Sequence, residues 1–324
     1  MTTISARIVA DSISQQGVRL TTMHLRYPRF IHAEVMTHRV FSRNARSSRA
    51  VPISKMIEEV IDDPVIPLHW GAAQNGMQAY EECKNWVEIN IPYFISKPGN
   101  SEEGEWENHF DITSRENAWL LAHQQVVDIA QGFNRAGYHK QVVNRLLEPF
   151  MHIDVLVTAT SWENFFALRD HHAAEPHIQM LSRAMKKAMA DSVPNILVPG
   201  EWHLPYVSED DLETKEVFDE DLEMMLPGKP ISQRETIKLS VARCARISYA
   251  PFDGEGSVDK DIALADRLLA DGHFSPLEHQ AMPDFYVDDR ALIKEWRNPS
   301  LQRNFTGWCQ YRALAEGGKF VSPA

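Results

Sequence analysis

Apolar and polar residues follow two different periods in the first half of the chain. Residues 6–11 and 18–25 alternate and are rich in β-branched side chains, which predicts two short strands. Pro28 comes after the second of them and suits the first turn of a helix. Residues 152–160, HIDVLVTAT, are apolar and β-branched enough for a buried strand.

Between these strands the apolar spacing becomes helical. Residues 53–135 are expected to be mainly helical, and ENAWLLAHQQVVDIAQGF carries apolar residues three and four apart. Gly137 offers a stop before a second helix through HKQVVNRLLE, which Pro149 closes. Helical spacing returns after the buried strand, in SWENFFALR and EPHIQMLSRAMKKAMADS. A helical insertion in an α/β or α+β fold is the expected architecture.

The last third of the chain begins with an acidic run. Residues 206–230 are interpreted as a solvated linker or a surface helix. After it, VARCARISYA (241–250) predicts a strand, DKDIALADRLLADGH an amphipathic helix ended by Gly272, and FSPLEH a polar turn. The expected parts, together one catalytic domain, are a main lobe over 1–205 with the insertion 53–135, a linker over 206–233 and a C-terminal lobe over 234–324.

Composition narrows the class of protein. The 324 residues are 44% apolar, with no run near the ~20 apolar residues of a membrane span and no signal-peptide pattern, so we expect a cytosolic protein. A net charge of -12 disfavours a polymeric nucleic acid as partner, because basic patches supply the counterion-release energy of such binding. Cys83, Cys244 and Cys309 show no metal or disulfide spacing and are interpreted as structural.

Residues 37–50, THRVFSRNARSSRA, concentrate positive charge in this acidic chain. Arg39, Arg43, Arg46 and Arg49 recur at spacings of four, three and three, and guanidinium groups match phosphate oxygens. A solvated basic face is the alternative. Asn44 and the serines compete for backbone groups, which favours a loop around a bound phosphate over a helix.

This segment resembles the signature RHRxxSxNxxSxRY of the flavin-dependent thymidylate synthases, in the form common among bacteriophages. The matching residues are His38, Arg39, Ser42, Asn44, Ser47 and Arg49. The chain departs from the signature at Thr37, Ala45 and Ala50, and Glu34 stands where the family usually has Gln. These departures bear on the flavin and nucleotide contacts at those positions.

Two further blocks carry the resemblance. HKQVVNRLLEP is similar to the family's helix ending in Ala-Arg-x-x-Leu-Pro, and this resemblance would make Arg145 a phosphate ligand. VTATSWENFFALR is similar to the segment whose last Arg contacts the pyrimidine. That residue is Arg169 here, and Asn164 would lie beside the flavin. CARISY (244–249) and HFSPLEH (273–279) resemble blocks that precede the signature in the family but follow it here, so the chain is expected to be circularly permuted.

The resemblance implies a homotetrameric enzyme that methylates dUMP at C5, with FAD as cofactor and NADPH and methylenetetrahydrofolate as co-substrates. Arg169 and Ser47 would be catalytic. The substrate would be bound by Ser47, Ser48, Arg49, Arg145 and Arg169. The flavin would be bound by His38, Arg39, Ser42, Asn44, Asn164, Ser248, His273, Ser275 and Glu278. Because the arginines of these segments, Arg43 and Arg46 included, are too many for one phosphate, we expect several anionic groups and sites shared between chains.

Other functions fit less well. His171, His172, His177 and Glu175 cluster, but they lack the spacing of a zinc site, so no metal is expected. No GxSxG, GxGxxG or P-loop is present, which disfavours a hydrolase, a Rossmann enzyme and an NTPase. Two alternatives stay open: hydroxymethylation of a pyrimidine nucleotide, and a non-catalytic nucleotide-binding relative.

Overall fold

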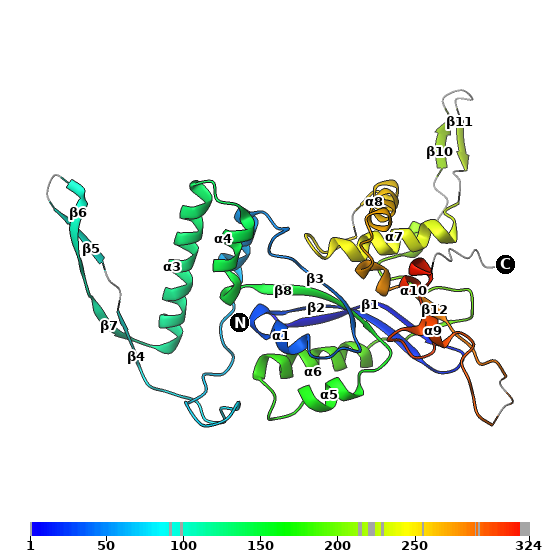
Figure 1. Ribbon diagram of the computed structural model, residues 1–324, viewed down its shortest axis with the longest axis horizontal. Coiled ribbons are helices and arrows are strands. Elements are labelled where there is room, and N and C mark those ends of the chain that lie inside the picture. Colours follow the sequence, from blue (N-terminus) through cyan, green and yellow to red (C-terminus); the bar gives the residue numbers. More distant parts are fainter. Residues whose placement is uncertain are drawn as a thin grey trace.

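The architecture comes from a computed structural model that describes residues 2–90, 93–97, 100–212, 216–219, 224–227, 230–254, 256–288, 290 and 292–317. Its centre is a five-stranded sheet in the order β3-β8-β2-β1-β9 (Figure 1). The strands are β1 (Ser5–Ser14), β2 (Arg19–Pro28), β3 (Ser42–Ala45), β8 (His152–Ala159) and β9 (Asn195–Leu197). Neighbours pair antiparallel except β1 and β9, which are parallel. The three strands expected from the alternating and β-branched segments are confirmed.

One face of the sheet is apolar and is covered by two helices. Met23, Leu25, Val155 and Val157 pack in one buried cluster with residues of α5 (Glu163–Arg169) and α6 (Pro176–Ala190). Both helices lie below the sheet in Figure 1. Because successive side chains of a strand point to opposite faces, this cluster leaves the even-numbered residues of β2 and β8 for the other face.

The C-terminal third of the chain covers that second face. Its elements are α7 (Gln233–Arg246), α8 (Val258–Ala270), η4 (Ser275–Glu278), β12 (Ala281–Pro283), α9 (Pro299–Gln302), β13 (Trp308–Gln310) and α10 (Tyr311–Glu316). α7 and α8 lie above the sheet in Figure 1. Leu156 of β8 packs against Cys244 and Ile247. The helix predicted before Gly272 is present as α8, and the layer formed by the elements after residue 230 packs against the central sheet.

Two histidines bridge the sheet and this covering layer. His203 bonds Ser12 Oγ through Nδ1 and Thr22 Oγ1 through Nε2, both at 2.8 Å. Thr22 and Thr158 meet at 2.6 Å, and Thr158 Oγ1 lies 2.8 Å from His279 Nδ1. Burial lowers the pKa of both imidazoles to about 3. Both rings are therefore neutral in the folded protein at neutral pH.

These histidines predict acid-sensitive stability. An unfolded His titrates near pH 6.5, so between about pH 6.5 and pH 3 the unfolded chain binds more protons, and stability falls as pH falls. At pH 5 each ring should lower the free energy of unfolding by about 2 kcal/mol relative to pH 7. Urea unfolding at the two pH values measures this. His203→Gln should reduce the loss by about 2 kcal/mol, the contribution of one ring, whereas the exposed His171→Gln should not change it. An equal loss in all three proteins contradicts the assignment.

The insertion is less helical than its apolar spacing predicts. Helices α2 (Ile53–Asp62) and α3 (Arg115–Arg135) form as expected, with Ser114 capping α3, and α4 (Lys140–Leu146) and η2 (Glu148–Phe150) follow. Between α2 and α3, however, strands pair: β4 (Val87–Asn90) with β7 (Phe110–Thr113), and β5 (Tyr93–Lys97) with β6 (Asn100–Glu107). They extend away from the sheet (Figure 1). The prediction of a mainly helical insertion is wrong over these strands.

Two predictions for the C-terminal third also need correction. Residues 241–246 belong to α7 and are not a strand; Ser232 and Glu235 begin this helix with a capping box. The described part of the acidic run contains η3 (Glu209–Asp211) and a hairpin of β10 (Glu216–Asp219) with β11 (Met224–Pro227), not a surface helix. Residues 213–215, 220–223 and 228–229 lie outside the described residues.

Candidate functional site

The arginine-serine segment runs from a turn into the edge strand β3. Ser42 and Asn44 are buried on that strand, while Arg43 donates to the backbone carbonyls of Met36 and His38 at 3.2 and 2.9 Å. Part of the expected ligand loop is therefore a strand. Its arginines also point to different partners, because only Arg43 is on the strand and no helix gathers residues three and four apart on one face.

Arg46 is not available to a ligand. Its two terminal nitrogens each donate to the Glu59 carboxylate at 2.7 Å, and Nη1 lies 3.4 Å from Asp154 Oδ2. The guanidinium is buried between α2 and β8. The expectation that Arg46 joins the other arginines around bound anions is wrong, because the two carboxylates already neutralise it.

Arg169 meets the beginning of the segment. At the end of α5, its Nε donates to His38 Nε2 at 3.0 Å, and Nη2 donates to Thr37 Oγ1 at 3.3 Å. Nη1 lies 3.6 Å from Glu34 Oε2. Two blocks 130 residues apart in the sequence thus converge, and two departures from the family signature, Thr37 and Glu34, both touch the predicted pyrimidine-binding arginine.

The contact fixes the protonation state of His38. Burial lowers the pKa of this imidazole, and the charges of Arg169 and Arg43 lower it further. A neutral ring that accepts at Nε2 carries its proton on Nδ1. The His38 ring also packs edge-to-face against Phe165, with 4.8 Å between the ring centres. The ring is therefore held as an acceptor that orients the Arg169 guanidinium.

A cavity of about 580 Å³ lies on the other side of the segment. It is lined by Arg39, Phe41, Arg43, Glu278, Arg303, Asn304, Gln310, Arg312 and Glu316. Arg312 pairs with Glu278 and Glu316, and Arg303 pairs with Glu316. Four arginines against two carboxylates leave the cavity positive, which suits a pyrophosphate. Arg39 and Glu278, both predicted flavin ligands, therefore line one cavity of a single chain.

Gln310 ties the segment to the C-terminal turn. Its buried amide nitrogen lies 3.1 Å from each of three acceptors, Ser42 Oγ, the Glu278 carbonyl and Asn304 Oδ1, between which its two hydrogens are shared. Asn304 Nδ2 also donates to Ser42 Oγ and to the Val40 carbonyl, at 3.0 and 2.9 Å. Ser42 is thus held inside the protein by two amides and faces no open cavity.

Two of the predicted substrate ligands, Ser48 and Arg145, meet at one carboxylate. Ser48 Oγ donates to Glu148 Oε1 at 3.2 Å, and Arg145 Nη1 lies 3.1 Å from the same oxygen. Arg29 Nη2 is also 3.1 Å from it. We call Arg29, Ser48 and Arg145 the phosphate cradle. Its donors are two guanidinium groups and a hydroxyl, a set that matches phosphate oxygens.

The remaining predicted residues are scattered in the single chain. Ser47 N donates to the Ser248 carbonyl at 2.9 Å, so these two meet through the backbone. The others are exposed and lie outside the 580 Å³ cavity: Arg49, Asn164, His273 and Ser275. The roles proposed for them stay predictions.

Sequence reasoning assigned no role to several residues that the fold brings to these places. Arg29 and Glu148 belong to the cradle, and Arg303, Asn304, Gln310 and Arg312 to the cavity. Glu148 carried a signal, because it stands where the related motif Arg-x-x-Leu-Pro has Leu. The cavity residues follow the signature by more than 250 positions, and only the fold connects them.

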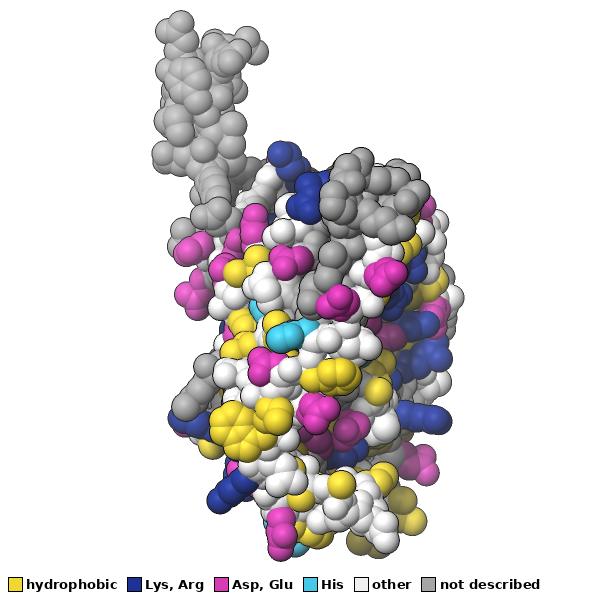
Figure 2. Space-filling view, turned by 90° about the vertical axis from the view of Figure 1, so that its left-hand side faces the viewer, with side chains coloured by type: hydrophobic (Ala, Val, Ile, Leu, Met, Phe, Trp, Pro, Cys, Tyr) yellow, Lys and Arg dark blue, Asp and Glu magenta, His cyan; other side chains and the backbone are white. Residues whose placement is uncertain are grey.

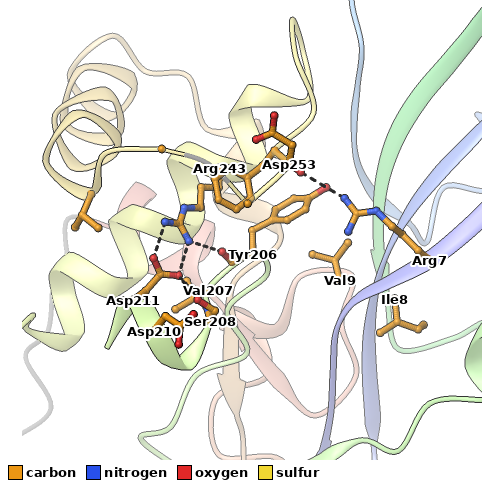
Figure 3. A pocket seen from close by; sticks show the side chains of 14 residues that line it. Arg7, Ile8, Val9, Tyr206, Val207, Ser208, Asp210, Asp211, Arg243 and Asp253 are labelled. Atoms are coloured by element: carbon orange, nitrogen blue, oxygen red, sulfur yellow. Dashed lines mark hydrogen bonds and ion pairs between the residues drawn. The ribbon is translucent and has the colours of Figure 1, made fainter. Parts of the chain in front are cut away.

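A larger cavity, of about 720 Å³, contains none of the predicted residues (Figure 3). Its aromatic rings already have cationic neighbours: Arg243 lies 4.3 Å from the centre of Phe252, and Arg7 5.6 Å from that of Tyr206. Arg243 is in turn neutralised by Asp211 at 2.6 Å. Figure 3 shows Tyr206 between the two arginines. We interpret this cavity as part of the junction between β1 and the C-terminal layer.

The described residues contain no group of three or more His, Cys, Asp or Glu side chains that could hold a metal ion. His177 instead bonds Glu175, which caps α6, and its Nε2 accepts from the Leu68 amide. All three cysteines are free. No described helix has the length and apolarity to cross a membrane.

Known proteins resemble this chain over more than half of its length. A family model described as thymidylate synthase complementing protein matches residues 19–195, more than half of the chain. Curated proteins gave no match. Among solved structures, a UMP/dUMP methylase PolB from Streptomyces cacaoi bound with 5-Br dUMP is 15% identical with a TM-score of 0.39, over 59% of this chain and 91% of that one. Thymidylate Synthase X from Helicobacter pylori with FAD and dUMP is 13% identical with a TM-score of 0.31, over 52% of this chain and 67% of that one.

Proposed function

The chain belongs to the thymidylate synthase complementing protein family, a family of enzymes, and from that premise we propose that it methylates dUMP at C5 to give dTMP. FAD would be the cofactor, with methylenetetrahydrofolate as one-carbon donor and NADPH as reductant. The observation that carries the proposal is the convergence on residues 37–50: Arg169 meets His38 at 3.0 Å on one side, and Glu278 shares a cavity with Arg39 on the other.

Each group of residues then has a task. The phosphate cradle, with Arg49 beside Ser48, would bind the 5′-phosphate, and Ser47 would lie next to it. Arg169 would face a uracil carbonyl, where its charge stabilises the negative charge that makes C5 nucleophilic. His38 keeps the guanidinium oriented by accepting from Nε. The positive cavity at Arg39 fits the pyrophosphate of FAD, which supplies when bound the redox chemistry that side chains lack.

We also propose that the sites are shared between copies in a homo-oligomer, as a tetramer. Apolar side chains are exposed on α3 and α4, beside Arg145; they are Leu120, Ile129, Val142 and Leu146. The insertion exposes Trp86, Phe110 and Ile112, and Figure 2 shows hydrophobic side chains among acidic ones at this end of the molecule. Surfaces of this kind are typical of subunit contacts. Another copy could bring Asn164, His273 and Ser275 to a site that one chain leaves incomplete.

The test is direct. Purified protein should absorb visible light as a flavoprotein, or bind FAD on reconstitution, and should convert dUMP with methylenetetrahydrofolate and NADPH to a product with the mass of dTMP. Parallel assays with UMP and dCMP show whether the protein acts on a different nucleotide. A product with the mass of a hydroxymethylated nucleotide would indicate hydroxymethylation in place of methylation. Sedimentation with and without FAD measures the assembly. A protein that binds no flavin contradicts the proposal, and a monomer active at full rate contradicts shared sites.

A further inference from the structure

A single carboxylate oxygen collects every donor of the phosphate cradle. Glu148 Oε1 lies 3.1 Å from Arg29 Nη2, 3.1 Å from Arg145 Nη1 and 3.2 Å from Ser48 Oγ. The Glu148 side chain is 26% exposed, so water could solvate its charge without these partners. The three donors of the cradle nevertheless all point at this carboxylate.

Neighbouring structure, not Glu148, holds the turn and the helix that carry Ser48 and Arg145. The buried Asn144 donates to the carbonyls of Ser48 and Val51 at 2.7 and 3.0 Å, which fixes the turn that carries Ser48. Lys140 donates to the Ala50 carbonyl at 2.9 Å. Arg145 lies on the same helix as these two side chains. The backbone that carries Ser48 and Arg145 is therefore held by contacts that do not involve Glu148.

We propose that Glu148 is an internal competitor for the nucleotide phosphate: its carboxylate occupies the cradle until a 5′-phosphate displaces it. This inference rests on the proposed function in assigning the cradle to the phosphate of dUMP. Two anions at hydrogen-bonding distance of the same three donors repel each other, so they cannot occupy the cradle together. Displacement raises the dissociation constant of any ligand held by its phosphate and leaves that of the unphosphorylated nucleoside unchanged.

Glu148→Gln is the matched change, because it keeps the shape of the side chain and removes the charge. The variant should bind dUMP about tenfold more tightly by calorimetry, since charged hydrogen bonds are about twice as strong as neutral ones and a neutral amide competes less well. Its affinity for inorganic phosphate should rise in parallel, and its affinity for deoxyuridine should not change. Asp266→Asn is the control for the change in net charge, because it removes a carboxylate of α8 that pairs with Lys238 of α7.

The outcomes separate this inference from the proposed function. Tighter binding of phosphate and dUMP, confined to Glu148→Gln, supports it. Tighter binding of phosphate by a protein that never binds dUMP supports the competitor but contradicts the proposed function. Unchanged or weaker binding of phosphate overturns the inference. Thermal unfolding checks that the variant is folded, and Glu148→Leu, which restores the apolar residue of the related motif, must give the same direction of change.

Discussion

Replacing Arg169 with alanine is expected to lower kcat for dUMP methylation by about 10²–10³-fold, the typical effect of removing one donor that stabilises charge developing in a transition state. The structure gives the side chain a fixed orientation, through His38 at 3.0 Å and Thr37 at 3.3 Å. If the proposed role holds, Arg169 acts on charge that appears only during the reaction, so the loss should fall mainly on kcat, and the KM for dUMP should change less.

Arg183→Ala is the matched control for this change. Arg183 is an exposed arginine on the neighbouring helix α6, paired with Asp170 at 2.8 Å, so kcat should stay near that of the parent protein. Flavin content and thermal unfolding should be unchanged in both variants. An Arg169→Ala protein with full kcat would remove Arg169 from the reaction, whatever its effect on dUMP affinity.

Arg243→Met is expected to lower the free energy of unfolding by about 3–5 kcal/mol, the range for breaking a buried ion pair by removing one partner. Arg243 is 3% exposed and holds two carboxylates, Asp211 at 2.6 Å and Asp261 at 3.3 Å. It also donates to the Tyr206 carbonyl at 2.6 Å. Methionine fills a similar volume but leaves Asp261 buried without this partner, although Arg246 remains 3.7 Å away.

The pH dependence of the same cluster has a defined sign. Burial by itself raises the pKa of Asp211, but hydrogen bonds from Arg243 and Ser208 outweigh it and lower the pKa to about 2. The cluster therefore adds stability above the unfolded pKa near 4, and this stability is lost as pH falls toward 2.

Lys238→Met is the control for Arg243→Met, and urea unfolding of the parent protein and of both variants measures the two losses of stability. Lys238 lies on the same helix but pairs with the exposed Asp266, so its loss should cost about 0–1 kcal/mol. Equal losses in the two variants would contradict the role of burial.

Elements with a strong local pattern could be predicted from the sequence. β1, β2 and β8 follow alternation or a β-branched run, and α3, α6 and α8 follow the helical period, because a single buried face imposes each period on consecutive residues. The start of α7 also has a local signal, the capping box of Ser232 and Glu235, although residues 241–250 were predicted to form a strand. The paired strands of residues 87–113 were missed because their partners, not their own spacing, determine them.

The sequence by itself determined the family, because the matching residues of the signature lie in one short segment, residues 37–50, where their spacing does not depend on the fold. The spacing of the positive charges in residues 37–50 could not determine which arginine is free for a ligand. By charge alone Arg46 and Arg39 look alike, yet Arg46 is neutralised by Glu59 and Asp154, whereas Arg39 lines an open cavity. Only the tertiary structure decided this, and it alone placed Glu148 in the phosphate cradle. The physical reason is that the energy of a charge depends on its distance to other charges and to water, and residues far apart in sequence set both.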